Sequence, residues 1–185
     1  MSASEIIPLY FADAETDHPA VDRWCAAVLD GRPARLLLLG PYWSGKSHTA
    51  YAALRRILAA GYRSDEITAH RASDLARTYE PGLTRVDTTP VTMVDDVTLT
   101  VDLVHEAKGP LRPDTVEVQA MMALEAGALA EAIADLVSLP DRSWILIAST
   151  PDLLAEAVGA DVADRILAAA ETAELRQRPL PELRW

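Results

Sequence analysis

Short apolar runs recur along the chain and predict buried β-strands. The clearest occupy residues 35–39, 91–96 and 144–148, which are dominated by aliphatic and aromatic side chains. Weaker candidates lie at residues 66–70 and 172–175. A strand without a polar face is buried on both sides, as the strands of parallel sheets are.

Between these runs, apolar residues recur at helical spacing, and proline and glycine mark the ends of the segments. One helix is predicted from Pro19, after His18, to a stop at Gly31. Another ends at Gly61 and a third ends at Pro140. These two helices cover residues 47–60 and 116–139. Further helices are predicted at residues 73–79, 152–158 and 161–170.

The alternation of strands and helices predicts an α/β fold, a parallel sheet flanked by helices on both faces. In such sheets ligands bind at the carboxyl ends of the strands. The chain of 185 residues is expected to form a single domain, residues 1–185, with residues 1–17 as an irregular, acidic N-terminal segment.

A phosphate-binding motif directly follows the first apolar run. Residues 40–47, Gly-Pro-Tyr-Trp-Ser-Gly-Lys-Ser, match the P-loop pattern GxxxxGK[ST]. In a P-loop, backbone N–H groups and the positive end of the following helix surround the phosphates of a nucleotide. Lys46 is therefore expected to reach the β- and γ-phosphates of ATP, and the Ser47 hydroxyl to bind Mg²⁺.

The surroundings of the motif supply further candidates. His48 either touches phosphate or is a solvated residue of the first helical turn. Tyr42 and Trp43 are bulky where many P-loops carry small residues, which favours binding over fast turnover. An apolar cluster in the N-terminal segment is a candidate to pack beside the nucleotide: Ile6, Ile7, Leu9, Tyr10 and Phe11. The predicted nucleotide-binding residues are Gly40, Pro41, Tyr42, Trp43, Ser44, Gly45, Lys46, Ser47 and His48.

Acids and hydroxyls follow the later strands, at the same edge of the sheet. Asp95 has the position of the acid that orders the Mg²⁺ shell, and Asp96 that of the group that orients the attacking water. Thr150 or Ser149 either reports the γ-phosphate or caps the turn before Pro151.

Together these motifs resemble the DnaC/IstB-type helicase-loader and transposition ATPases of the AAA+ class. The likeness runs from about residue 10 onward. It rests on five elements: Leu-Leu-Leu-Leu-Gly40-Pro, GK[ST]-His, Val-Asp95-Asp96, Ala-Ser149-Thr150 and Ala-Asp164-Arg165-Ile-Leu. The resemblance implies a P-loop sheet of order 5-1-4-3-2. It also implies that Arg165 is an arginine finger reaching the γ-phosphate of an adjacent subunit, and hence an oligomer when ATP is bound.

The expected function is that of an ATPase that binds ATP and Mg²⁺ and hydrolyses ATP slowly. The residues expected to catalyse the hydrolysis are Asp96, Thr150 and Arg165. By the resemblance, the ATP or ADP state controls assembly on a DNA-bound partner such as a replicative helicase or a transposase. Single-stranded DNA is a further candidate ligand of the assembled state.

Two other functions stay open. A P-loop small-molecule kinase usually has a basic lid, and only Lys108 and Arg112 are basic between Asp96 and Arg142. A strand between the P-loop strand and the Asp95 strand would favour the ATPase, and direct adjacency of those two would favour the kinase. The second of these functions is that of a nucleotide-binding scaffold without significant turnover.

Composition narrows the class of partner. The net charge of −11 opposes general nucleic-acid binding, so any such binding needs a local basic patch. Cys25 is the single cysteine, which excludes an intrachain disulfide. No apolar segment is long enough to span a membrane and no signal peptide is recognisable, so a soluble cytoplasmic protein is expected.

Overall fold

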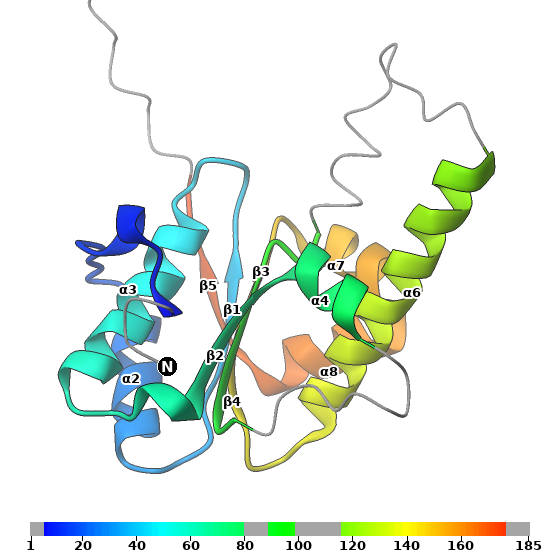
Figure 1. Ribbon diagram of the computed structural model, residues 1–185. Helices are drawn as coiled ribbons and strands as arrows, with labels where there is room; N and C mark the ends of the chain where they lie inside the picture. The colour runs from blue at the N-terminus through cyan, green and yellow to red at the C-terminus, as the bar shows by residue number, and fades with distance from the viewer. Residues whose placement is uncertain (1–5, 80–88, 99–115, 177–185) are drawn as a thin grey trace, which may run out of the picture.

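A five-stranded parallel sheet forms the centre of the molecule (Figure 1). The computed structural model describes residues 6–79, 89–98 and 116–176, with residues 116–122 described by their backbone alone. The strands are β1 (Arg35–Leu39), β2 (Ile67–Arg71), β3 (Val91–Asp95), β4 (Ser143–Ala148) and β5 (Glu171–Glu174). Their order is β2-β3-β4-β1-β5, which confirms the predicted order 5-1-4-3-2.

Helices cover both faces of the sheet, as the alternating pattern predicts (Figure 1). On one face lie α2 (Pro19–Leu29) and α3 (Lys46–Ala59). The other face carries α4 (Ala72–Thr78), α6 (Val116–Ser138), α7 (Pro151–Val158) and α8 (Ala160–Ala169). Two short 3₁₀ turns complete the described elements, η1 (Leu9–Phe11) and η2 (Ser64–Glu66). The boundaries of the strands and α-helices fall within a residue or two of the predicted ones, whereas the two 3₁₀ turns were not predicted.

Burial on both faces explains the unbroken apolar run of β1. Leu36 and Leu38 pack with α2 and α3, whereas Leu37 and Leu39 pack with the helices of the opposite face. Successive side chains of a strand point to opposite faces, so a strand covered on both sides needs apolar residues at every position. The end of β1 leads into the P-loop.

The start of α2 depends on local hydrogen bonding. Pro19 occupies the first turn, where its missing N–H costs nothing, and the His18 Nδ1 atom accepts a hydrogen bond from the Ala20 N–H at 3.2 Å. Further along, the Trp24 indole N–H donates to the Ala34 carbonyl at 3.1 Å and lies 3.2 Å from the Trp144 carbonyl. The helix is thereby fixed against the ends of β1 and β4.

The N-terminal segment packs on α3 only in part. Ile6 is buried and Phe11 stacks on Tyr51 of α3, with ring centroids 4.4 Å apart. Leu9 and Tyr10, also predicted to pack, are instead 90% and 69% exposed. A single 3₁₀ turn places Phe11 inward, so its two predecessors point outward. Within the described part of the chain, no helix has the length and apolarity needed to traverse a bilayer.

Candidate functional site

The P-loop connects the end of β1 to the first turn of α3. Gly45 precedes the helix in the left-handed conformation, with φ of 89°, which allows the chain to turn sharply into α3. At the other end of the loop Gly40 lies against the chain that leaves β5. A Cβ atom built on Gly40 would lie 2.4 Å from the Leu175 carbonyl oxygen. Two glycines of the motif are thus required for different reasons, one by its backbone conformation and one by close approach.

Lys46 is buried at the start of α3 and bonds to the loop itself. Its Nζ atom donates to the carbonyl oxygens of Gly40 at 2.6 Å and Pro41 at 2.9 Å. The ammonium therefore lies inside the curve of the loop, where the phosphates of a nucleotide bind in proteins with this motif.

Ser47 and Asp95 meet at the carboxyl ends of β1 and β3. The Ser47 hydroxyl donates to Asp95 Oδ1 at 2.9 Å. The pKa of Asp95 is raised to about 6, chiefly by burial and also by the neighbouring Asp96 carboxylate, while the hydrogen bond from Ser47 acts in the opposite direction. A hydroxyl and a carboxylate at this separation form a donor set suited to Mg²⁺, and a bound cation would favour the ionised carboxylate.

Asp96 follows β3 in a strained conformation, with φ of 61°. Asp96 lines the same cavity as the P-loop. This cavity has a volume of about 340 Å³. The cavity is lined by Phe11, Tyr42, Trp43, Ser44, Gly45, Lys46, Ser47, His48 and Asp96. The structure therefore brings most of the predicted nucleotide-binding residues together with the second acid.

One buried hydroxyl of the loop lacks a hydrogen-bond partner among the residues that the structure describes. Among the described residues, the Ser44 Oγ atom is one of a few buried side-chain polar atoms without a hydrogen bond. It lines the cavity. An unsatisfied buried hydroxyl is costly, and a ligand oxygen in the cavity would satisfy it. The residues present thus fit a nucleotide phosphate chain with its metal ion.

The N-terminal segment forms one wall of this cavity. Phe11 lines it and lies edge-on to His48, with ring centroids 6.3 Å apart. His48 Nε2 also accepts a hydrogen bond from the Glu15 N–H at 3.3 Å. His48 is thus half-buried and held by the N-terminal segment. Its predicted contact with phosphate stays a prediction.

Ser149 and Thr150 have different neighbours. The Ser149 carbonyl accepts a hydrogen bond from the Gly40 N–H at 3.1 Å, which joins the end of β4 to the P-loop. Thr150 is exposed and caps α7, because its hydroxyl accepts from the Leu153 N–H at 3.2 Å. The Thr150 hydroxyl therefore caps a helix in the structure, as one of the two alternatives predicted. The catalytic role of Thr150 stays a prediction.

Thr98 is a site neighbour that the sequence did not indicate. It is buried, its hydroxyl donates to the Ser149 Oγ at 3.1 Å, and it accepts from the Ser149 N–H at 3.0 Å. It links the chain after the acidic pair to the end of β4. A threonine three residues after Asp95 is the only sequence signal, and it is too common to single out.

Arg165 is exposed on α8, which packs on the face of the sheet opposite α3. No described residue forms an ion pair or hydrogen bond with its side chain. This exposed position is compatible with a contact to another molecule. Its predicted role as an arginine finger stays a prediction. Lys108 and Arg112 lie outside the described residues.

Solved structures share this architecture. No protein-family model and no curated protein matches the chain. The DnaC helicase loader superimposes with a TM-score of 0.55 at 15% identity, over 90% of this chain and 99% of that one. DnaI gives 0.53 at 15% identity, over 95% and 91%. AMPPCP-bound DnaA from Aquifex aeolicus gives 0.54 at 16% identity, over 92% of this chain and 51% of that one.

The chain thus spans about half the length of the DnaA structure and most of the DnaC and DnaI structures. At these identities the likeness concerns the fold. The chain has the P-loop fold of the DnaC, DnaI and DnaA structures, so the resemblance to the DnaC/IstB-type AAA+ class, first drawn from its motifs, is confirmed in its fold.

Proposed function

We propose that this protein binds ATP with Mg²⁺ in the P-loop cavity and hydrolyses the nucleotide slowly. The observation that carries the proposal is the arrangement of Lys46, Ser44 and Ser47 around one cavity, with Asp95 hydrogen-bonded to Ser47. The binding of AMPPCP, an ATP analogue, to the structurally similar DnaA supports the same ligand class.

Each residue has a separate role in this mechanism. Lys46 exchanges its bonds with loop carbonyls for bonds to the β- and γ-phosphates. Ser47 and Asp95 would hold the metal ion, which would neutralise charge that develops on the phosphoryl oxygens. Asp96 lines the cavity and orients the attacking water. Because aspartate is short and this residue is strained, water is positioned loosely and turnover is slow.

The nucleotide state is proposed to control assembly. In this proposal Arg165 acts across an interface between copies, reaching the γ-phosphate bound by its neighbour. The assembled form then acts on a DNA-bound partner such as a replicative helicase or a transposase, with single-stranded DNA as a further ligand. The structural likeness to a helicase loader and to a replication initiator bound to single-stranded DNA supports this class of partner.

The order of the sheet favours the ATPase over a kinase. β4 lies between β1, which leads into the P-loop, and β3, which ends in Asp95. The kinase alternative calls for those two strands to be adjacent. The scaffold alternative differs from the proposal only in turnover, so it needs an activity measurement.

Calorimetric titration with AMPPCP and Mg²⁺ tests the binding step directly. We expect saturable binding to the wild-type chain and binding weakened about tenfold to a hundredfold by Lys46→Ala, since a hydrogen bond to a charged group is lost. Arg32→Ala is the matched control, because Arg32 is an exposed cation paired with Asp30 and does not line the cavity. Equal binding by Lys46→Ala and the wild type would refute the site.

Steady-state ATP hydrolysis then separates the enzyme from the scaffold. Turnover that disappears in Asp96→Ala supports the enzyme, and AMPPCP binding without turnover supports the scaffold. For Arg165, mixtures of Arg165→Ala and Lys46→Ala subunits should recover part of the wild-type activity, because one wild-type arginine can meet one wild-type P-loop. No recovery would count against action across an interface.

A further inference from the structure

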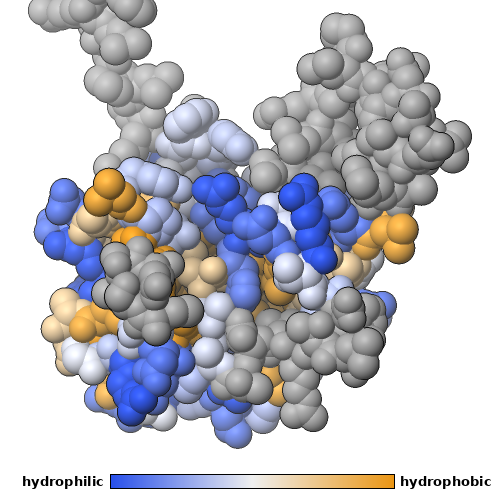
Figure 2. Space-filling model, in the orientation of Figure 1, coloured by the Kyte–Doolittle hydropathy of each residue, from blue (hydrophilic) through white to orange (hydrophobic). Residues whose placement is uncertain are grey.

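Two exposed apolar features of the chain lie on opposite sides of the sheet. One is Leu9 and Tyr10 of η1, which we call the knob; it lies on the α2–α3 side. The other is a groove of about 740 Å³ between α4 and α6, lined by Ala76, Tyr79, Ala123, Leu124, Glu125, Gly127, Ala128 and Glu131. Figure 2 shows hydrophobic surface at both places, over η1 on the left and beside α6 on the right.

We infer that the knob of one copy of this chain docks into the α4–α6 groove of another copy. The knob exposes a leucine and an aromatic ring, and half of the residues that line the groove are small, namely Ala76, Ala123, Gly127 and Ala128, which leaves room for large side chains. Leu124 borders the groove and is itself 75% exposed. Exposed apolar surface of this kind is typical of interaction sites.

Charge and hydrogen bonding match as well. The Arg71 Nη2 atom donates to the Tyr10 hydroxyl oxygen at 3.3 Å, so the Tyr10 hydroxyl keeps its own proton to donate outward. Two carboxylates, Glu125 and Glu131, line the groove; Glu125 is paired with Arg77 at 3.2 Å and Glu131 is exposed. A donor supported by a cation thus faces a carboxylate, which is the stronger kind of hydrogen bond.

The placement also determines the type of assembly. A knob and a groove on opposite sides of one chain form a head-to-tail contact, which builds rings or filaments rather than a closed two-fold dimer. Because Phe11 follows the knob and lines the P-loop cavity, the contact would bring a neighbour close to the nucleotide site. The inference deepens the assembly step of the proposed function, but the contact itself does not require nucleotide.

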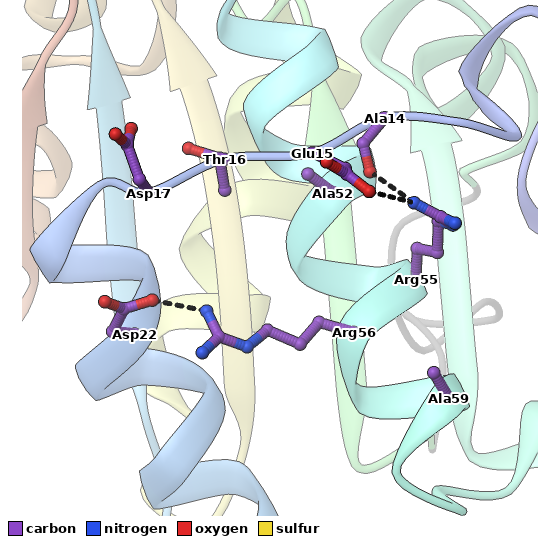
Figure 3. Close-up of a pocket in the computed structure, with 9 residues that line it drawn as sticks. All are labelled: Ala14, Glu15, Thr16, Asp17, Asp22, Ala52, Arg55, Arg56 and Ala59. Atoms are coloured by element: carbon purple, nitrogen blue, oxygen red, sulfur yellow. Dashed lines mark hydrogen bonds and ion pairs between the residues drawn. The ribbon is translucent and has the colours of Figure 1, made fainter.

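A second cavity, shown in Figure 3, lies under the N-terminal segment and was considered as a site. Arg55 donates to the Ala14 carbonyl at 3.0 Å and Arg56 pairs with Asp22. Its arginines are therefore already bound to protein groups, and acids line it as well. The hydrogen bond from Arg55 to Ala14 holds the N-terminal segment on α3 and thereby supports the knob.

Sedimentation velocity of the full chain over a range of concentrations tests the contact, with and without AMPPCP and Mg²⁺. We expect concentration-dependent association of the wild type. Leu9→Asn should weaken it about tenfold or more, since a buried leucine contributes at least that much. The matched control is Leu29→Asn, which changes an exposed leucine of α2 outside both features. Gly127→Gln should also weaken association, because a side chain there meets open space and fills the groove without disturbing α6.

Charge reversal makes the test specific. Arg71→Glu and Glu131→Arg should each weaken association, and a mixture of these two variants or the double variant should recover it. A wild type that stays monomeric in both states up to roughly 0.1 mM would overturn the inference. So would association that Leu9→Asn leaves unchanged, which would indicate another surface. Failure of the proposed function is distinguishable, because AMPPCP would then not bind while the response to Leu9→Asn persisted.

Discussion

Replacing Gly40 by alanine should destabilise the fold more than the same change at any other glycine that the structure describes. The new Cβ atom would lie 2.4 Å from the Leu175 carbonyl oxygen and 2.7 Å from the Ser44 Oγ. Ser44 can rotate its hydroxyl away. Leu175 cannot move as easily, because its backbone N–H donates to the Leu39 carbonyl at 2.7 Å.

The expected cost follows from two effects. Forcing an extra carbon into packed surroundings costs about 1–3 kcal/mol. The φ of +155° at Gly40 adds strain of roughly 1 kcal/mol for a residue with a side chain. Together the loss is about 2–4 kcal/mol, a large part of the roughly 5–15 kcal/mol that stabilises a typical domain.

Two matched changes separate these effects. Gly45→Ala introduces strain alone, since φ is +89° and no atom lies within 4 Å of the new carbon, so it should cost about 1 kcal/mol. Gly127→Ala introduces neither strain nor a clash, since Gly127 lies within helix α6 and a Cβ atom there would meet open space. Because alanine favours helix more than glycine does, this change should stabilise the chain by about 0.5–1 kcal/mol.

Urea unfolding followed by circular dichroism measures the series. With a typical slope, Gly40→Ala should lower the midpoint by about 1–2 M, with the slope itself unchanged. The expected order of stability is Gly127→Ala, wild type, Gly45→Ala and Gly40→Ala. A Gly40→Ala chain as stable as Gly45→Ala would refute the close approach to Leu175.

Three further predictions concern single groups. Because the folded-state pKa of Asp95 is raised to about 6, the folded chain binds more protons than the unfolded chain between about pH 4 and 6. Stability should therefore fall as pH rises through that range, by up to about 3 kcal/mol, and Asp95→Asn should remove the slope in urea titrations at several pH values. An unchanged slope would contradict the burial of Asp95. Burial raises the pKa of the Cys25 thiol to about 11, so iodoacetamide should label it slowly below pH 9 in the native chain and fast in urea; equal rates would show that it is accessible. Phe11→Ala removes the stacking contact with Tyr51 and should cost about 1 kcal/mol in the same urea assay, with Leu9→Ala as an exposed control of little effect.

Local signals in the sequence were sufficient to predict the elements. Pro19 and the glycine after α2 mark that helix, and the apolar run before Gly40 marks β1. Such features act within a few residues of each other, so the chain displays them directly. The sheet order, in contrast, was expected from the resemblance of motifs and not from the periodicity.

The site could be predicted only where its residues belong to motifs. Ser47 and Asp95 are hydrogen-bonded and Lys46 bonds to the loop, since each follows a parallel strand or begins the helix after it; their roles toward a nucleotide stay predictions. Thr98 and Phe11 were harder, because their roles depend on contacts with Ser149 and Tyr51 that are distant in sequence. Pattern reasoning also gave no means to decide which residues of the apolar N-terminal cluster would face inward.

The two hydrogen bonds between Lys46 and the loop carbonyls make phosphate binding an exchange reaction rather than a simple addition. The loop's own oxygens compete with any incoming anion for the same ammonium. A singly bound, weakly charged anion gains little from displacing them, whereas a polyphosphate can replace both bonds and add others along the backbone N–H groups. Discrimination against the abundant small anions of a cell would thus be built into the resting loop, before any contact with the base or sugar of a nucleotide.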